Sequence, residues 1–207
     1  MRAKKHMEKY GTTIDQLAKV SVKNHKNGCL NPNSQYQKEC TLEEVHKARM
    51  IADPLTVLHC SPIGDGAAAA VLCSKEKAAQ YTTKPIWVAA SILTTGTYDI
   101  LRDITSNELE RRAAKEAYES AGIAPEDISL AEVHDCFTIA EFLRCESLGL
   151  CPEGEYGQWV DRGWTEIGGR LPVNPSGGLL AKGHPVGATG VAQVAEVVWH
   201  LRGEAGK

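Results

Sequence analysis

The sequence predicts an α/β protein with a largely parallel sheet, and three observations indicate this class. Residues 128–148 have the pattern of a short strand, a polar turn and a helix. The same order recurs over residues 170–202, where a glycine-rich loop separates the strand from the helix. Residues 85–93 are almost continuously apolar, which is typical of a strand covered on both faces. Alternating strands and helices favour a parallel sheet.

The first 50 residues are polar and predict short helices joined by loops. Residues 13–16 and 41–44 have the spacing of capping boxes, so a short helix is expected to begin at each. Turn-forming pairs such as Asn27-Gly28 indicate a loop over residues 24–39. A plain surface excursion is the alternative interpretation of this region.

The rest of the chain is expected to alternate between strands and helices. Apolar runs predict strands at residues 55–59, 67–73, 85–93, 128–133 and 170–174, although 67–73 is also compatible with a helix. Helical patterns cover residues 75–81, 107–121, 138–148 and 191–202, and a long polar loop covers 151–169. Thr138 and Thr189 are the expected N-caps of the last two helices, and Gly122 and Gly203 the residues that end two helices.

His134, Asp135 and Cys136 occupy the predicted strand-to-helix turn. Phe137 and Phe142 have the spacing of a hydrophobic staple at the helix start. A helix N-terminus lowers a thiol pKa, which would make Cys136 a better acid, base or nucleophile. The alternative is a buried, inert cysteine. The interpretation as a functional group is favoured because a histidine stands two residues earlier.

A second histidine lies in the glycine-rich loop from Asn174 to Gly190, which contains five glycines and two prolines. His184 precedes a predicted helix, whose N-terminus disfavours imidazolium and keeps the ring neutral and basic. The carboxyl ends of parallel strands share one sheet edge, so His134, Cys136 and His184 are expected to cluster there. A loop histidine with a structural hydrogen bond is the alternative. A phosphate-binding loop is disfavoured because the sequence lacks G-x-x-x-x-G-K-[ST].

The composition is that of an ordinary globular protein. Among the 207 residues, 43% are hydrophobic and 24% charged, and the net charge of -3 argues against a nucleic-acid partner. No apolar run approaches the roughly 20 residues of a membrane helix, so no membrane insertion is expected. Seven cysteines without a C-x-x-C pair indicate free thiols and no metal site. With no secretory signal and no peroxisomal signal at Lys207, the expected location is the cytoplasm, or the peroxisome in a eukaryote.

Two motifs together carry a family resemblance. The segments Asn174–Gly178, Gly183–Pro185 and Gly187–Gly190 resemble the C-terminal half of a thiolase. His134-Asp-Cys-Phe137 is similar to the motif of sterol-carrier-protein-type thiolases and their acetyl-CoA acetyltransferase-like relatives. The resemblance extends over nearly the whole chain and implies a partial thiolase-like fold, with the end of the N-terminal core domain and most of the C-terminal βαβαβ domain.

The resemblance also implies how the chain divides. Residues 1–50 would belong to the loop domain that covers acyl-CoA, and residues 51–82 to the last strand region of the N-terminal core. Residues 83–207 would form the C-terminal domain, incomplete at its end because two further strands of the family are missing.

An acyl-CoA acyltransferase of thiolase type is the implied activity, which makes or breaks a carbon–carbon bond next to a coenzyme A thioester. Such chemistry needs an acyl-carrying cysteine, a base, a second acid/base and donors aimed at the thioester oxygen. By resemblance, His184 activates the nucleophile, His134 organises an oxyanion site and Cys136 is the acid/base. Asp135 is expected to be a structural carboxylate. Coenzyme A thioester is the expected substrate, with no other cofactor.

Four residues are expected at the substrate by the same resemblance. Gly177, Gly178 and Gly183 would let the backbone lie against the acyl-CoA. Ser61 falls where the family has a serine near the pantetheine arm, although Pro62 and Gly64 differ from the usual glycine and asparagine.

One departure from the family is large, because no residue matches the acyl-carrying cysteine. The chain is therefore expected to be a partial gene product, a fragment, or a half enzyme that pairs with another chain. Acyl-CoA and either a second copy or a complementary chain are the expected partners. Two other functions stay open: a non-catalytic subunit that binds acyl-CoA or a partner, and a thiolase-like retro-aldolase component.

Overall fold

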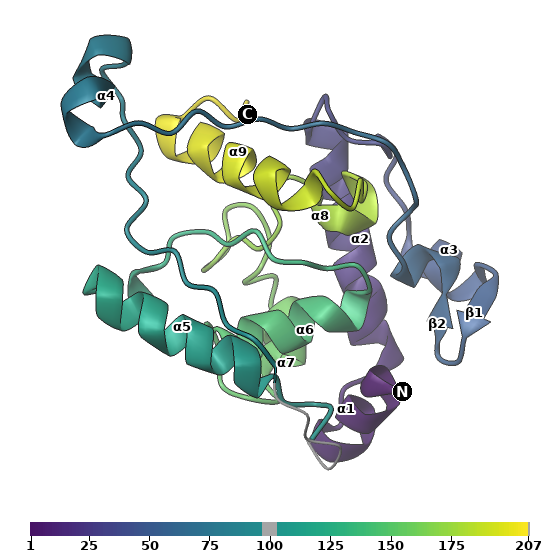
Figure 1. The fold of residues 1–207 in the computed structure, drawn as a ribbon. Helices are drawn as coiled ribbons and strands as arrows, with labels where there is room; N and C mark the ends of the chain where they lie inside the picture. Colours follow the sequence, from purple (N-terminus) through teal and green to yellow (C-terminus); the bar gives the residue numbers. More distant parts are fainter. Residues whose placement is uncertain (97–102, 207) are drawn as a thin grey trace.

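Helices dominate the part of the chain that the computed structural model describes, residues 1–96 and 103–206 (Figure 1). The helices are α1 (Arg2–Tyr10), α2 (Ile14–Leu30), α3 (Leu42–Lys47), α4 (Lys75–Tyr81), α5 (Glu108–Ala121), α6 (Thr138–Ser147), α7 (Tyr156–Asp161), α8 (Gly178–Ala181) and α9 (Thr189–Arg202). Two strands, β1 (Met50–Ala52) and β2 (Leu55–Thr56), and two 3₁₀ turns, η1 (Val57–His59) and η2 (Pro125–Asp127), complete the elements.

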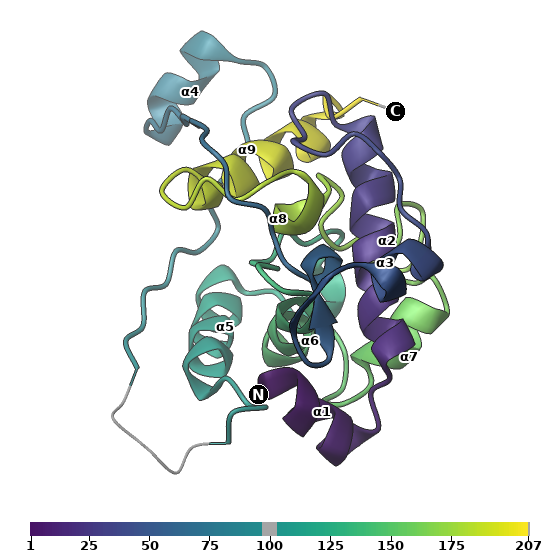
Figure 2. The same ribbon diagram turned by 90° about the vertical axis from the view of Figure 1, so that its right-hand side faces the viewer.

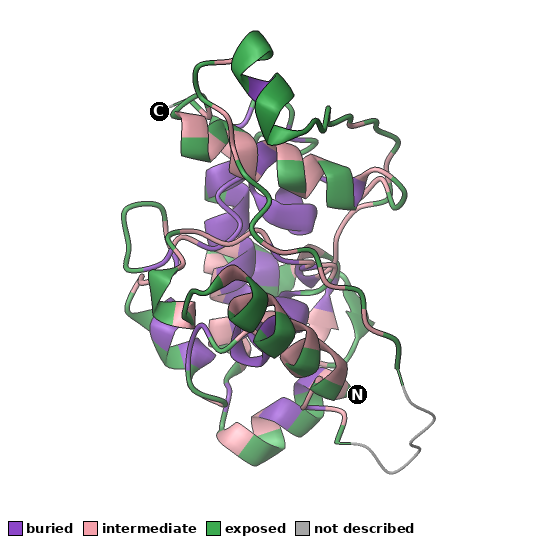
Figure 3. Ribbon diagram, turned by 60° about the vertical axis from the view of Figure 1, so that its left-hand side comes forward, coloured by how far each residue is buried: buried purple, intermediate pink, exposed green. Residues whose placement is uncertain are grey.

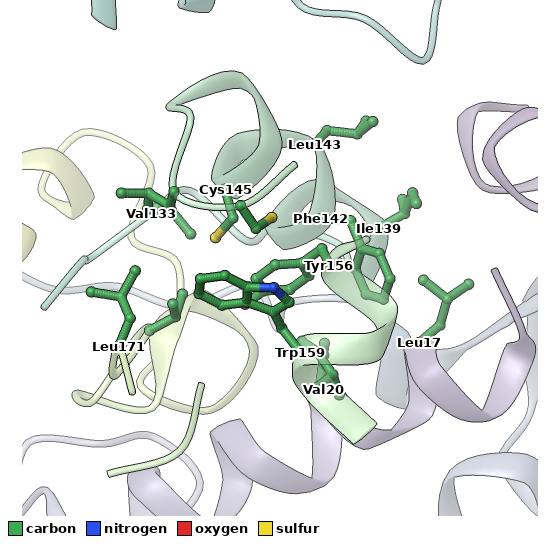
Figure 4. Packing of buried hydrophobic residues seen from close by; sticks show 14 of the residues in the cluster. Leu17, Val20, Val133, Ile139, Phe142, Leu143, Cys145, Tyr156, Trp159 and Leu171 are labelled. Atoms are coloured by element: carbon green, nitrogen blue, oxygen red, sulfur yellow. The ribbon is translucent and has the colours of Figure 1, made fainter. Parts of the chain in front are cut away.

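The hydrophobic core lies where α1, α2, α6, α7 and α8 meet, and buried positions gather in this central part (Figure 3). Phe142 of α6 and Tyr156 of α7 are fully buried, and their rings meet edge to face with centroids 5.0 Å apart (Figure 4). Burial of each such side chain contributes about 1.5–3 kcal/mol. The core also includes Val133 and Val173, so it anchors the segments that lead into both predicted site loops.

Helix α2 is longer than the sequence pattern predicts. Its capping box is confirmed: the Thr13 hydroxyl accepts from the Gln16 backbone N–H, and the Gln16 amide oxygen accepts from the Thr13 N–H. The loop expected from residue 24 is wrong, because the helix continues to Leu30. Buried polar side chains on this last part, including Lys23 and Asn24, bind other segments, and these contacts override the local turn preference.

The ends of α4, α5, α6 and α9 agree with the sequence patterns to within a residue or two, whereas α3 ends at Lys47 and α1 and α8 were not predicted. The capping box at Thr41 is confirmed, and Gly122, Gly149 and Gly203 adopt left-handed conformations at or just past the helix C-termini. Within the predicted 151–169 loop lies α7, which the sequence pattern missed.

The predicted starts of α6 and α9 need two corrections. Thr138 and Thr189 are the first helical residues and not the N-caps, which are Phe137 and Ala188. The staple at α6 is also wrong, because Phe137 is 44% exposed whereas Phe142 is fully buried.

The expected multi-stranded parallel sheet is not formed within residues 1–96 and 103–206. The one sheet found there is antiparallel and joins β1 to β2, and residues 57–59 form η1 where the strand was expected to continue. Residues 128–133 and 170–174 run parallel, as predicted, but share a single bridge between Ala131 and Val173. Within the described part of the chain, residues 170–174 also have no regular strand on their other side, where the Leu171 and Val173 backbone N–H groups donate to the Trp164 and Thr165 carbonyl oxygens. A regular parallel sheet needs further strands beside these segments.

Residues 67–73 and 85–93 are extended but form no regular strand, which corrects both predictions. Figures 1 and 2 show this part of the chain, on both sides of α4, lying along the outside of the helices. Val71, Leu72 and Leu93 are 97%, 78% and 94% exposed. Apolar runs of this kind are suited to cover on both faces, and within the described residues these three side chains lack that cover.

The domain boundaries at residues 50 and 82 stay predictions. Residues 97–102 lie outside the described residues. Lys207, where a peroxisomal signal would end, lies outside them as well. None of the helices in the described ranges combines the length and apolar character that crossing a bilayer requires.

Candidate functional site

The segment from Cys60 to Ile63 lies between the two histidine-bearing loops. Cys60 forms an antiparallel bridge with Phe137, and Ile63 forms a parallel bridge with His184. Between them, the Ser61 backbone N–H donates to the Cys136 carbonyl oxygen at 3.0 Å. Three segments far apart in the sequence thus meet at one place.

The two histidines predicted to cluster are in contact. The rings of His134 and His184 meet edge to face, with centroids 4.9 Å apart and planes at 85°. Burial lowers the pKa of both, and the nearby His184 and Arg144 lower that of His134 further. Both imidazoles are therefore neutral at pH 7 and able to accept a proton.

Hydrogen bonding around Thr189 determines which nitrogen of His184 is basic. The Thr189 hydroxyl donates to the Pro185 carbonyl oxygen at 2.9 Å, so the bond of 2.8 Å to His184 is one in which Nδ1–H donates to the hydroxyl. The neutral ring then carries its lone pair on Nε2. The sequence interpretation missed this role of Thr189; its position one helical turn after Pro185 is the signal that could have revealed it.

Cys136 differs from the prediction in its acidity. Burial raises the pKa of the Cys136 thiol, and Asp135 raises it further. The charge of Arg144 lowers this pKa, but by less than burial raises it. The expected lowering by the helix N-terminus is wrong for this thiol. Cys136 is consequently a protonated thiol at neutral pH, which suits a proton donor better than a resting thiolate.

The glycines at 177 and 178 are required by packing inside the protein. Gly177 has φ 100°, and a Cβ there would lie 2.8 Å from the Gly28 Cα of α2. Gly178 has φ 59°, and a Cβ there would overlap the Asp135 carboxylate. Their contact with an acyl group stays a prediction.

Gly183 lines an open cavity of about 730 Å³ between residues 64–69 and α9. Pro185 and Lys182 line the same cavity. Ser61 is half-buried beside Cys136, where its backbone is bonded. The assignment of Gly183 and Ser61 to coenzyme A binding stays a prediction.

A buried polar network under the two loops was missed by the sequence interpretation. Lys23 donates to Glu141 at 2.7 Å and to the Val173 carbonyl oxygen at 2.8 Å. Tyr156 and Asn174 each donate to Glu141 at 2.8 Å. The sequence of α2 does contain a signal for this network. Asn24 and Asn27 follow Leu17 and Val20 at helical spacing, so they lie on the same buried face.

Comparison with known proteins agrees with this geometry. The family described as "Thiolase C-terminal domain-like" matches residues 90–207. The acetyl-CoA acetyltransferase of Methanothermobacter thermautotrophicus is 52% identical over 100% of this chain and 55% of its own length. Bos taurus sterol carrier protein 2 is 48% identical, over 99% of this chain and 39% of its own length. The benzoylsuccinyl-CoA thiolase subunit BbsB of Thauera aromatica is 43% identical, over 99% and 54%.

Solved structures show the same likeness. An Ltp2-ChsH2(DUF35) aldolase superposes with a TM-score of 0.89 at 30% identity, covering 99% of this chain and 55% of that one. A monomeric SCP2-thiolase like protein from Mycobacterium smegmatis, 20% identical, superposes with a TM-score of 0.71 over 98% and 45% and supports the fold alone.

The family match and the superposition with the aldolase confirm the partial thiolase-like fold and its α/β class. The chain spans about half the length, or less, of the curated relatives it matches. Because the family match covers more than half of the 207 residues, the chain belongs to the Thiolase C-terminal domain-like family.

Proposed function

We propose that the chain supplies the C-terminal part of a site that makes or breaks a carbon–carbon bond next to a coenzyme A thioester. The observation that carries this proposal is the contact between His134 and His184, with their centroids 4.9 Å apart, beside the Cys136 turn. Two neutral imidazoles and a protonated thiol form a set of proton acceptors and a donor within one small region.

The proposed roles follow from the protonation states. His184 Nε2 takes the proton of the acyl-carrying thiol, which the remainder of the enzyme supplies. The Cys136 thiol gives a proton to the α-carbon in cleavage and takes it back in condensation. His134 helps to hold the thioester oxygen as negative charge develops on it. Coenzyme A thioester is the substrate, and no further cofactor enters these steps.

A retro-aldolase component is the second candidate, and one observation favours it. The Ltp2-ChsH2(DUF35) aldolase superposes closely, with a TM-score of 0.89. Retro-aldol cleavage of a 3-hydroxyacyl-CoA breaks the bond between C2 and C3, leaving a carbonyl compound and a shorter acyl-CoA. This reaction needs a base and a proton donor but no acyl-carrying cysteine. A binding subunit without catalysis is the third function, and it needs only the acyl-CoA contacts.

A fusion protein tests these functions. We expect the 207-residue chain alone to give no thiolytic cleavage of acetoacetyl-CoA with free CoA. Fusion to the part of the Methanothermobacter enzyme that lies outside the matched 55% is expected to restore it. His184→Ala should lower the restored rate by about 10²–10⁴-fold, the usual contribution of a general base. His46→Ala, at an exposed histidine of α3, is the matched control and should leave the rate unchanged.

The other outcomes separate the alternatives. A fusion that cleaves 3-hydroxyacyl-CoA but not acetoacetyl-CoA would support the aldolase. Binding of acetyl-CoA without cleavage of either substrate would support the binding subunit. Turnover by the isolated chain that is lost in Cys136→Ala would instead make Cys136 the nucleophile.

The proposed partners follow from the incomplete coverage of the relatives. Exposed apolar residues on either side of α4, such as Leu72 and Leu93, lie where a covering chain would pack. A second copy of this chain, or a chain that supplies the remaining part of the fold, is the proposed partner of the isolated chain.

A further inference from the structure

Three carboxylates on the stretch that carries His134 and Cys136 each bind the loop that leads to His184. The Glu132 carboxylate accepts from the Ser176 backbone N–H at 2.9 Å and from its hydroxyl at 2.8 Å. The Asp135 carboxylate accepts from the Leu179 backbone N–H at 2.6 Å. The Glu141 carboxylate accepts from the Asn174 side-chain amide at 2.8 Å.

Helix α2 closes this arrangement from the other side. Asn24 donates its side-chain amide to Asp135 at 2.7 Å and to Glu141 at 3.1 Å. Lys23 donates to Glu141 at 2.7 Å. Asp135 and Glu141 are fully buried, so their oxygens have no access to solvent that could replace these partners.

We propose that Glu132, Asp135 and Glu141 are positioning residues, a carboxylate clamp that holds the His134–Cys136 turn at a set distance from His184. The proposal rests on the proposed function for its chemical meaning, but the geometry stands without it. Asp135 lies directly between His134 and Cys136, so its bond to Leu179 fixes both neighbours relative to α8.

The clamp has a second property, which is its response to pH. Desolvation raises the pKa of the partly buried Glu132 to about 7, and Glu196 adds to the rise. The bonds from Ser176 and the charge of Lys182 oppose it. Burial likewise raises the pKa of Asp135 well above its usual range, with Glu141 and Glu132 adding to the effect.

Burial therefore makes the folded chain as a whole most stable while Glu132 and Asp135 keep their protons. Each folded-state pKa lies above the unfolded one, so their contribution is complete at low pH and is lost as pH rises through the folded values. The positive charge of Lys182 limits this loss at Glu132. The bonds from Ser176 and Leu179 favour the charged carboxylates, so they should hold His134 beside His184 above pH 7 as well.

The experiment uses nuclear Overhauser effects between the ring protons of His134 and His184 in the whole chain. We expect a cross-peak that persists as pH rises from 6 to 9. In Glu132→Gln, whose amide oxygen keeps an acceptor for Ser176, the cross-peak should also persist. In Glu132→Ala it should be weak at every pH. Glu126→Gln, at an exposed carboxylate of η2, is the matched control and should behave as the wild type.

Hydrogen exchange gives the second measurement. The Leu179 amide should exchange about tenfold faster or more in Asp135→Ala, since a buried N–H loses its acceptor. If Asp135→Ala does not fold, the two Glu132 variants decide the proposal. A cross-peak in Glu132→Ala as strong as in Glu126→Gln, with Ser176 equally protected, would overturn it. Since no step requires turnover or coenzyme A, failure of the clamp is distinguishable from failure of the proposed function.

Discussion

The Lys23 ammonium lies 2.7 Å from the Glu141 carboxylate, and the two side chains are only 4% and 0% exposed. This ion pair joins α2 to the helix that follows the His134–Cys136 turn. The Asn24 side-chain amide donates to both Asp135 and Glu141. Lys23 supplies the positive charge that compensates the Glu141 carboxylate. The pair therefore connects the stability of the core with the geometry of the site.

Replacement of Lys23 should be strongly destabilising. Lys23→Met leaves the Glu141 carboxylate buried without its cation, which costs about 3–5 kcal/mol of unfolding free energy. Lys26→Met is the matched control on the same helix, because Lys26 pairs at 2.9 Å with Glu166 while both remain exposed. Such a surface pair is worth about 1 kcal/mol or less. Urea denaturation of both variants measures the difference, and equal losses would contradict a buried, compensating role for Lys23.

Thr189 should determine the tautomer of His184. Thr189→Val removes the acceptor of Nδ1–H, so the Nδ1–H form should lose population to the Nε2–H form. Imidazole ¹⁵N chemical shifts at pH 8 measure the two populations directly. Thr165→Val is the control, since the Thr165 hydroxyl is buried and unpartnered within the described residues. An unchanged Nδ1–H population in Thr189→Val would refute the assigned hydrogen-bond direction.

Gly178 should tolerate alanine less well than another glycine of similar backbone conformation. Gly178 and Gly168 have φ of 59° and 82°, so alanine at either costs about 1–2 kcal/mol of backbone strain. At Gly178 the added Cβ also overlaps the Asp135 carboxylate, whereas at Gly168 it meets nothing within 4 Å. Overpacking of this kind adds about 1–3 kcal/mol. Thermal or urea denaturation should show the larger loss for Gly178→Ala; equal losses would mean that Asp135 moves aside freely.

The stability of the chain should depend on pH through Glu132. Its folded pKa of about 7 lies above the usual value of 4.5, so the folded state keeps a proton that the unfolded state releases. The resulting stabilisation should fall by about 2 kcal/mol between pH 5 and pH 8. Glu132→Gln lacks this proton, so subtracting its unfolding free energies from those of the wild type isolates the effect. A difference that does not change over this range would show that the carboxyl group is normally solvated.

The apolar segments beside α4 should drive association of the isolated chain. Leu72 and Leu93 are 78% and 94% exposed, and exposed apolar side chains of this kind favour binding to another chain. Light scattering should detect a dimer or larger species, and the amides of residues 67–93 should exchange rapidly in any monomer present. Leu72→Lys together with Leu93→Lys should reduce association, with Lys75→Arg as a control. A stable wild-type monomer with protected amides there would contradict this expectation.

Local patterns predicted several helix ends correctly because their signals lie within a few residues. The capping boxes at Thr13 and Thr41, and the glycines that end α5 and α9, depend on neighbours three or four positions away. The contact of His134 with His184 was predicted for a different reason, namely that both motifs follow parallel segments.

The remaining errors concern interactions with distant residues. Residues 85–93 have the composition of a buried strand, but a strand forms only beside partners. Asn24 was assigned to a loop because turn-forming residues follow it, and the long-range partners of Lys23 and Asn24 cannot be read from α2 itself. The pKa of Cys136 was predicted from the helix N-terminus alone, whereas burial outweighs it.

The polar face of α2 has a consequence for synthesis of the chain on the ribosome. Lys23 precedes its partner Glu141 by 118 residues. At 5–20 residues per second, α2 is synthesised roughly ten seconds before that partner. A leucine-rich face would be an exposed apolar surface during this interval, whereas Lys23, Asn24 and Asn27 can bind water. The side chains that later bind Glu141, Asp135 and Asn174 thus favour solubility of the incomplete chain.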